Sequence, residues 1–244
     1  MINIDLNCDL GESFGSYSKG NDEEILKRIT SANIACGFHA GDPEIMLRTV
    51  QLALKNGVKI GAHPGYPDLQ GFGRRHMDIP SEEIYSLVLY QIGALEAIVR
   101  AQGGSLSHVK PHGALYNRAA KDVEIARSIT KAVHDFNPFL TLFGLANSYL
   151  ITAGEEFGLH TASEVFADRT YQNDGTLTPR HQEGAVIHND TKALSQVVKM
   201  VKEHKVISTD GMEIEIKPDT ICLHGDNENA LLFADKILSA LKDG

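Results

Sequence analysis

Hydrophobic and polar positions along the chain fall into two patterns, short runs with a period of two and longer runs with a helical period. Helical patterns separate most of the short runs, and the clearest are residues 43–56, capped by Asp42-Pro43 and ended by Gly57, and residues 81–101. We predict seven β-strands near residues 2–6, 31–36, 58–62, 107–110, 140–143, 158–162 and 221–224. Strands that alternate with helices are typical of a parallel sheet.

The faces of these strands favour a closed barrel. In the first strand Asp5, Asn7 and Asp9 share one face and Leu6 and Cys8 the other, because side chains alternate along a strand. A polar face recurs in every predicted strand except the fifth. An open parallel sheet covered by helices would be apolar on both faces, whereas a barrel can turn one face toward a polar lumen. We therefore predict an α/β fold, a single parallel β/α barrel of seven strands, over residues 1–244.

The polar positions at one end of this barrel are the candidate site. Catalytic groups of parallel β/α barrels lie at the C-terminal ends of the strands. Among the polar positions, those nearest the C-terminal ends of the strands are therefore the candidates. Asn7 is a candidate substrate contact, and the candidate catalytic residues are Asp9, His39, His63, Lys110, His112, Glu164 and His224. So many ionisable groups at one end favour proton-transfer chemistry over structural hydrogen bonding.

His108 and His112 have the H-x3-H spacing that places two imidazoles on one metal ion when the segment is helical. Pro111 between them favours an extended segment instead. Four extended residues span roughly 13 Å, too far for two ligands of one ion.

A metal site would have to assemble across strands, for example from Asp9, His39 and His63, a combination that suits zinc or another divalent ion. Lys110 argues against it, because its ammonium would compete for the carboxylate charge. We therefore expect no resident metal ion, and keep a divalent metal ion as an open alternative.

Composition excludes several classes of partner. The formal net charge of -9, with no basic stripe to offset it, opposes nucleic-acid binding. No apolar run approaches the ~20 residues that cross a bilayer, so we expect no membrane partner. Three cysteines are too few for a disulfide framework, which fits the cytoplasm. The sequence contains neither a P-loop nor a dinucleotide fingerprint.

Two long loops carry arginines that can bind an anion. The loop at 63–80 combines glycines with Arg74 and Arg75, and the loop at 163–190 contains Asp168, Arg169 and Arg180. The planar guanidinium fork donates two hydrogen bonds at once to a carboxylate or phosphate. We expect Arg74, Arg75, Asp168 and Arg169 to bind substrate.

Six motifs in order along the chain resemble the LamB/YcsF family, whose members are described as one of the subunits of bacterial ATP-dependent 5-oxoprolinase. The motifs are DLNCDLGE (5–12), ANIACGFHAGD (32–42), GAHPGYPD (61–68), VKPHGALY (109–116), EVFADRTY (164–171) and CLHGD (222–226). The resemblance implies a seven-stranded barrel similar to the glycoside hydrolase/deacetylase superfamily. It also implies opening of 5-oxo-L-proline to L-glutamate, with ATP as co-substrate and two partner subunits.

One departure and several alternatives follow from the resemblance. Polysaccharide deacetylases of that superfamily use an H-x3-H pair after the third strand, and here His63 is followed by Pro67 where the second histidine would fall. A deacetylase-type metal is thereby disfavoured. A stand-alone metal-dependent amidohydrolase or carbohydrate deacetylase, a non-catalytic oxoproline-binding subunit, and homo-oligomerisation stay open.

Overall fold

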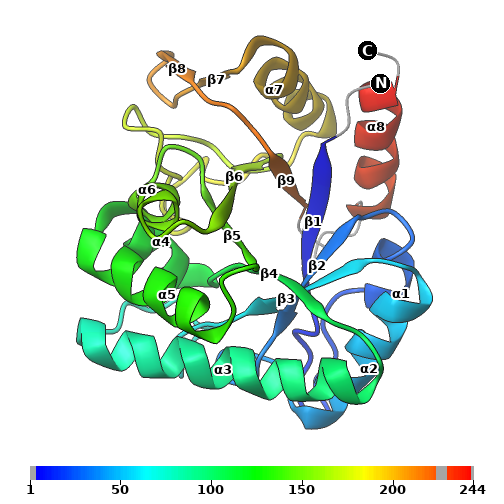
Figure 1. Cartoon of the computed structure of the whole chain (residues 1–244). Helices are drawn as coiled ribbons and strands as arrows, with labels where there is room; N and C mark the ends of the chain where they lie inside the picture. Colours follow the sequence, from blue (N-terminus) through cyan, green and yellow to red (C-terminus); the bar gives the residue numbers. More distant parts are fainter. Residues whose placement is uncertain (1–3, 224–229, 243–244) are drawn as a thin grey trace.

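The computed structural model describes residues 4–223 and 230–242, and its centre is a closed barrel of parallel strands (Figure 1). Each strand pairs in parallel with its neighbours, and the last barrel strand closes the ring between the first and the sixth. The barrel strands are β1 (Asp5–Leu10), β2 (Ser31–Ala35), β3 (Lys59–His63), β4 (Leu106–Val109), β5 (Thr141–Leu145), β6 (His160–Phe166) and β9 (Thr220–Leu223). The predicted seven-stranded parallel barrel is confirmed.

Helices cover the outside of the barrel (Figure 1). They are α1 (Asp22–Ile25), α2 (Pro43–Lys55), α3 (Ser81–Ala101), α4 (Gly113–Lys121), α5 (Val123–Phe136), α6 (Tyr149–Glu156), α7 (Asp190–Glu203) and α8 (Ala230–Lys242). The Asp42 carboxylate caps α2 by accepting from the amides of Glu44 and Ile45, as a residue ahead of an N-terminal proline is expected to do. By length and composition α3 could cross a bilayer. In the fold it packs against α5 and the barrel.

Several boundaries differ from those predicted. The first and sixth strands run further, to Leu10 and Phe166, because polar residues that face the lumen continue them beyond the apolar run. β2 ends at Ala35 and β4 at Val109, so His39 and His112, which were selected as strand-end positions, lie in the loops that follow. The hairpin β7 (Lys205–Ile207) and β8 (Glu213–Glu215) was not predicted, since strands of three residues carry too little periodicity.

The polar face of β1 forms a hydrogen-bonded column inside the barrel. Asp5 accepts from Thr220 Oγ1 at 2.7 Å, and Thr220 accepts from Asn7 Nδ2 at 2.7 Å. Asn33 Nδ2 donates upward to Asn7 Oδ1 at 2.8 Å and to Asp9 Oδ1 at 2.9 Å. The column satisfies these buried polar groups and leads from the base of the barrel to its C-terminal end.

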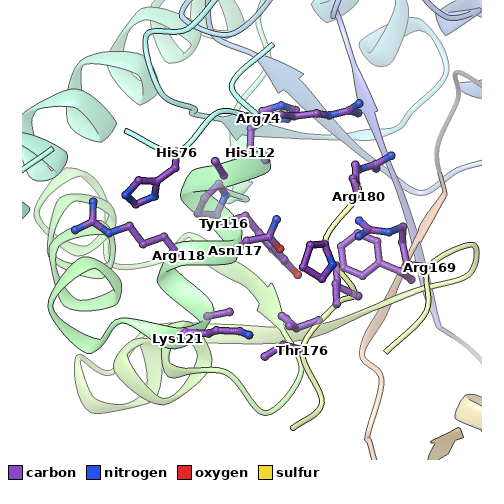
Figure 2. Close-up of a pocket in the computed structure, with 18 of the residues that line it drawn as sticks. Arg74, His76, His112, Tyr116, Asn117, Arg118, Lys121, Arg169, Thr176 and Arg180 are labelled. Carbon is purple, nitrogen blue, oxygen red and sulfur yellow. The ribbon is translucent and has the colours of Figure 1, made fainter. Parts of the chain in front are cut away.

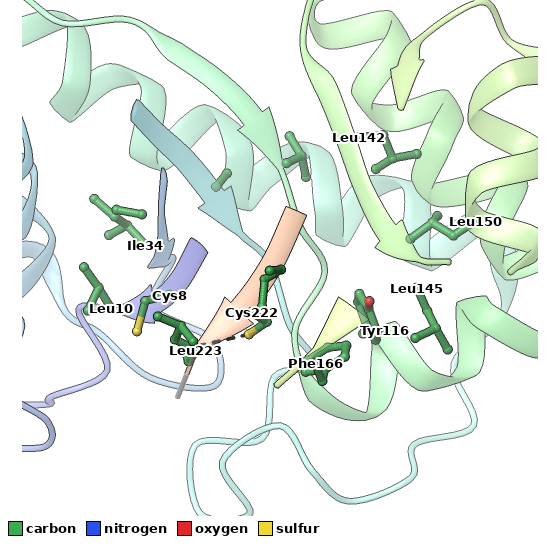
Figure 3. Packing of buried hydrophobic residues seen from close by; sticks show 14 of the residues in the cluster. Cys8, Leu10, Ile34, Tyr116, Leu142, Leu145, Leu150, Phe166, Cys222 and Leu223 are labelled. Atoms are coloured by element: carbon green, nitrogen blue, oxygen red, sulfur yellow. Dashed lines mark hydrogen bonds between the residues drawn. The ribbon is translucent and has the colours of Figure 1, made fainter. Parts of the chain in front are cut away.

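Apolar side chains on the outer face of the strands pack against the helices. Figure 3 shows this layer around Cys8, Leu10 and Ile34 on one side, and around Leu142 and Leu150 on the other. All five are buried. The barrel therefore has an apolar outer face and a polar lumen, which is the division that the strand faces predicted.

Gly61 on β3 makes room for an imidazole in the lumen. A Cβ at this position would lie 2.1 Å from His108 Nε2. His108 cannot move away easily, because it stacks on Phe143 at 4.2 Å and lies 2.8 Å from Asn33 Oδ1. A side chain at position 61 would overpack this layer.

We expect Gly61→Ala to lower the free energy of unfolding by about 1–3 kcal/mol, the usual cost of overpacking a core. The measurement is denaturant unfolding followed by circular dichroism. Gly93→Ala is the matched control: it lies inside α3 with nothing near its missing Cβ, so alanine should stabilise by about 0.5–1 kcal/mol. Equal effects of the two substitutions would contradict the conclusion that a side chain at position 61 overpacks the lumen.

Candidate active site

The site is built around the buried ammonium of Lys110, one residue beyond β4. Lys110 Nζ lies 2.7 Å from Glu164 Oε1 and 3.0 Å from Asp9 Oδ1, and it also donates to Asn7 Oδ1 at 3.1 Å. Burial alone would lower the pKa of Lys110, but Asp9, Cys222 and Glu164 outweigh it and raise that pKa well above its usual value. The side chain is therefore a fixed cation and not a proton acceptor.

Three histidines form one aromatic cluster: His63 is the last residue of β3, and His39 and His112 lie in the loops after β2 and β4. His63 Nδ1 donates to the Lys110 carbonyl at 2.7 Å, and His112 Nε2 donates to the Phe72 carbonyl at 2.9 Å. The other nitrogens, His63 Nε2 and His112 Nδ1, face each other at 2.9 Å. His39 stacks on His112 with ring centroids 3.7 Å apart. Burial, and then the neighbouring imidazoles, lower the pKa of His39 and of His112 well below the usual value.

Two carboxylates border the histidine cluster. Asp9 Oδ2 lies 3.3 Å from His63 Nε2, and Glu12 Oε1 lies 3.7 Å from His112 Nδ1. Burial and the nearby Asp9 raise the pKa of Glu12. The ligand atoms of Glu12, His39, His63 and His112 lie within 4.8 Å of one another, so this is the group that could hold a metal ion.

The loop after β3 closes over the histidines in an unusual backbone conformation. Phe72 and Gly73 have φ angles of 55° and 61°, in the left-handed region. A Cβ at Gly73 would come within 2.7 Å of His39 and 2.9 Å of His112. Glycine is therefore required both by the backbone and by the close packing of the loop, and the conformation points the Phe72 carbonyl at His112.

A cavity of about 610 Å³ opens above these groups, and Asp9, His63, Lys110 and His112 are among the residues that line it. Its wall is strongly cationic. Arg74, Arg169 and Arg180 lie toward one end of the cavity in Figure 2, and Arg118 lies toward the other. In total six Lys and Arg side chains and two carboxylates occur among the described lining residues. Such a wall suits a substrate with more than one negative charge.

Arg169 is held in place from behind. Its guanidinium donates from Nε to the Ala185 carbonyl at 3.2 Å and from Nη2 to the Thr178 carbonyl at 2.6 Å. Burial and the neighbouring Arg180 lower its pKa to about 10. The side chain still carries its charge at neutral pH, and a bound anion would offset the repulsion between the two arginines.

Comparison with known proteins agrees with this architecture. The LamB/YcsF family profile matches residues 4–244. A 5-oxoprolinase subunit of Bacillus subtilis is 61% identical over 242 residues, covering 99% of this chain and 94% of that protein. The chain belongs to the LamB/YcsF family.

Two solved structures extend the likeness to the fold. The lactam utilization protein of Thermus thermophilus has 45% identity and a TM-score of 0.92, covering 99% of this chain and 97% of that one. A glycoside hydrolase, the β-N-acetylhexosaminidase of Streptomyces coelicolor, gives a TM-score of 0.52 at 9% identity, covering 98% of this chain and 63% of that one. The second match concerns the fold alone.

The structure brings together most of the predicted catalytic residues of this LamB/YcsF member, and leaves some predicted contacts outside the cavity. Asp9, His39, His63, Lys110, His112 and Glu164 form one connected group. His224 lies outside the described residues.

Among the predicted substrate contacts, Arg74 and Arg169 line the cavity. Asn7 lies beneath Lys110 in the polar column, and Arg75 forms an ion pair with Asp68. Asp168 is half-buried in the loop after β6, where its carbonyl accepts from the Ile187 amide. Of the predicted substrate contacts, Arg74 and Arg169 are therefore the two that a molecule in the cavity could reach.

Sequence reasoning missed Glu12 and Tyr116, and it named Arg180 only as a loop arginine that could bind an anion. Glu12 follows β1 in an irregular segment where the period of two no longer applies, although it closes the DLGE motif. Tyr116 lies in the first turn of α4, where one face of a short helix reaches the cavity. Arg180 shares the long loop with Arg169, and only the fold shows that it turns inward.

We expect Lys110→Met to lower the free energy of unfolding at pH 7 by about 3–5 kcal/mol, because it leaves the buried Glu164 carboxylate without its cation. Adding Glu164→Gln should recover part of that loss. Denaturant unfolding of both variants is the measurement. Lys59→Met, which removes an exposed lysine 4.0 Å from Asp5, should cost less than about 1 kcal/mol.

The same ion pair sets a pH dependence. The folded-state pKa of Lys110 is raised above its usual 10.5, so its contribution is complete below that pH and is lost as the pH rises through the folded-state value. The parent chain should therefore stay more stable than Lys110→Met from pH 7 to pH 9. Loss of that difference within this range would contradict a raised pKa of Lys110.

Proposed function

We propose that this chain binds 5-oxoproline in the mouth of its barrel and opens the lactam to glutamate, as one component of a 5-oxoprolinase complex that hydrolyses ATP. The proposal is supported by membership of the LamB/YcsF family and by the likeness to 5-oxoprolinase subunits. The observation that carries it is the Asp9–Lys110–Glu164 group beside two imidazoles, in a cavity with a cationic wall.

Phosphorylation makes the lactam reactive. Transfer of the γ-phosphoryl group of ATP to the lactam oxygen releases ADP and leaves an O-phosphorylated ring carbon, which water attacks far more readily than an amide. The carbon–nitrogen bond of the adduct then breaks as the nitrogen takes up a proton, which gives an acyl phosphate. A second water releases phosphate and leaves glutamate.

Asp9 is the general base for the attacking water in this scheme. Its carboxylate lines the cavity, and Lys110 and Asn33 hold Oδ1 in place, so that Oδ2 faces His63. Asp9 takes the proton of the attacking water and can pass it to the ring nitrogen as that nitrogen leaves. Lys110, a permanent cation, stabilises the negative charge of the phosphoryl group on the lactam oxygen.

The cationic wall binds the negative groups of the substrate. Arg74 and Arg169 are placed to hold the carboxylate of oxoproline, and Arg180 adjoins Arg169 to balance the phosphoryl charge. A cavity of about 610 Å³ is within the range of about 300–1,000 Å³ usual for small-molecule sites. It has room for the phosphorylated lactam as well as for oxoproline itself.

A stand-alone metal-dependent amidohydrolase is the second candidate, and the cluster of Glu12, His39, His63 and His112 is the observation that favours it. Hydrolysis of oxoproline by the isolated chain without ATP would establish that the chain is a stand-alone amidohydrolase. A non-catalytic binding role would instead leave turnover unaffected when Asp9 or Lys110 is replaced.

The test is reconstitution of the chain with its two partner subunits, followed by glutamate formation and oxoproline-dependent ADP release. We expect Asp9→Asn to lower kcat by about 10²–10⁴-fold, the usual share of a general base. Arg74→Gln should raise KM for oxoproline by about 10–100-fold with a smaller change in kcat, since it removes a charged hydrogen bond.

Arg100→Gln provides the matched control, because Arg100 is exposed at the end of α3 and does not line the cavity. Its kinetics should equal those of the parent chain. An Asp9→Asn complex that forms glutamate at the parent rate would refute the base assignment, and glutamate formation that needs no ATP would refute the coupled reaction.

A further inference from the structure

Two buried imidazoles face each other through nitrogens that carry lone pairs. A carbonyl oxygen only accepts hydrogen bonds, so the proton of His63 is on Nδ1, toward Lys110 O, and the proton of His112 is on Nε2, toward Phe72 O. The nitrogens that face each other at 2.9 Å are therefore both unprotonated in the neutral rings. Two lone pairs at this distance repel unless a cation lies between or beside them.

Glu12, His63 and His112 are each held by a hydrogen bond through one polar atom, and each directs its other polar atom toward the space between them. Glu12 Oε2 accepts from Lys19 Nζ at 3.0 Å, which leaves Oε1 facing the histidines. His63 and His112 are oriented by backbone carbonyls. Metal-binding histidines are usually oriented in this way, by a hydrogen bond from the nitrogen that does not touch the metal.

The spacing of the atoms suits a small ion. Ligand bonds of about 2.0–2.2 Å in a tetrahedral site place neighbouring ligand atoms about 3.3–3.6 Å apart. His63 Nε2 and His112 Nδ1 are 2.9 Å apart, and His112 Nδ1 and Glu12 Oε1 are 3.7 Å apart. One separation is shorter and the other longer than this range. Shifts of a few tenths of an ångström would bring both into it.

His39 belongs to the surroundings of this site and not to its ligands. Its ring is parallel to that of His112, with an interplanar angle of 2° and centroids 3.7 Å apart. A nitrogen lone pair lies in the plane of its ring, so one ion cannot lie in both planes. The ring is fully buried, and neither of its nitrogens has a hydrogen-bond partner among the described residues. His39 Nε2 is 3.9 Å from Glu12 Oε1, at the edge of the cluster.

The nearby lysines do not compete for the ligand oxygen. Lys110 binds Asp9 Oδ1 and Glu164, and Lys19 binds the outer oxygen of Glu12. The argument that a neighbouring ammonium excludes a metal therefore applies to Asp9 and not to Glu12 Oε1. Asp9 remains a carboxylate neighbour of the site, 3.3 Å from His63.

We propose that His63 Nε2, His112 Nδ1 and Glu12 Oε1 bind one divalent transition-metal ion of the zinc type at the floor of the cavity. Two imidazoles and one carboxylate form a ligand set that suits Zn²⁺ and leaves a fourth coordination position. Because His63 and His112 line the cavity, the ion is accessible from it. The set differs from the cross-strand combination of Asp9, His39 and His63 suggested by the strand ends alone.

Cobalt binding to the purified full-length chain tests the site. After chelator treatment, titration with Co²⁺ should give visible absorption bands that saturate at one equivalent, and Zn²⁺ should abolish them by competition. His63→Gln and His112→Gln should each weaken Co²⁺ binding by more than about 100-fold, and Glu12→Gln by more than about 10-fold. Circular dichroism of each variant checks that it is folded.

His181→Gln is the matched control, since His181 is an exposed histidine on the cavity wall outside the cluster. It should bind cobalt as the parent chain does. Binding that is weaker than stoichiometric, or that survives all three ligand substitutions, overturns the site. A proton NMR resonance for a hydrogen shared by His63 and His112, in a chain that takes up no metal, assigns the cation between them as a proton and equally overturns it. The titration contains no substrate, ATP or partner protein, so its outcome is separate from that of the proposed reaction.

Discussion

The ammonium of Lys110 is the charge on which the arrangement of the barrel mouth depends. It joins the ends of three strands, because Asp9 comes from β1, Glu164 from β6, and Lys110 follows β4. The buried Glu164 carboxylate and the half-buried Asp9 carboxylate could not share this place without a cation between them. The polar column beneath fixes the same atoms from below, through Asn7 and Asn33. The same contacts thus set the position and the charge of these groups. Lys110 and Asn33 orient the Asp9 carboxylate so that its other oxygen faces His63.

The loop after β3 adds the second constraint. The left-handed backbone at Phe72 and Gly73 brings one carbonyl to His112, and the absence of a side chain at Gly73 lets the loop lie against His39. Strained backbone at a functional site persists only where the surroundings over-determine it. Here the ring of Phe72 is covered by the Lys19 ammonium at 3.5 Å. The tautomer of His112 is therefore a product of loop geometry and not of the barrel.

The period of two along the strands predicted much of the fold and of the site. It placed Asp9, His63 and Glu164 in the lumen because each lies on a strand whose alternation is regular. Where the chain leaves the strand, alternation no longer applies. Glu12 and Arg180 could not be placed for that reason, since their positions depend on how an irregular loop turns and on which neighbours it meets. The sequence also could not reveal the paired lone pairs of the histidines, which depend on two backbone carbonyls brought close by the closed fold.

The contrast between the cavity and the whole chain has a consequence for what reaches the site. The chain carries a formal charge of -9, while the described cavity wall has six cations and two carboxylates. At physiological salt, fields are screened over about 8 Å, so an approaching anion responds mainly to the charges nearest to it. A small anion that enters the mouth is close to the arginines and far from the acidic exterior. A large acidic surface touches the exterior first and is repelled. The charge pattern thus acts as a filter by size, admitting compact anions to a protein that repels extended ones.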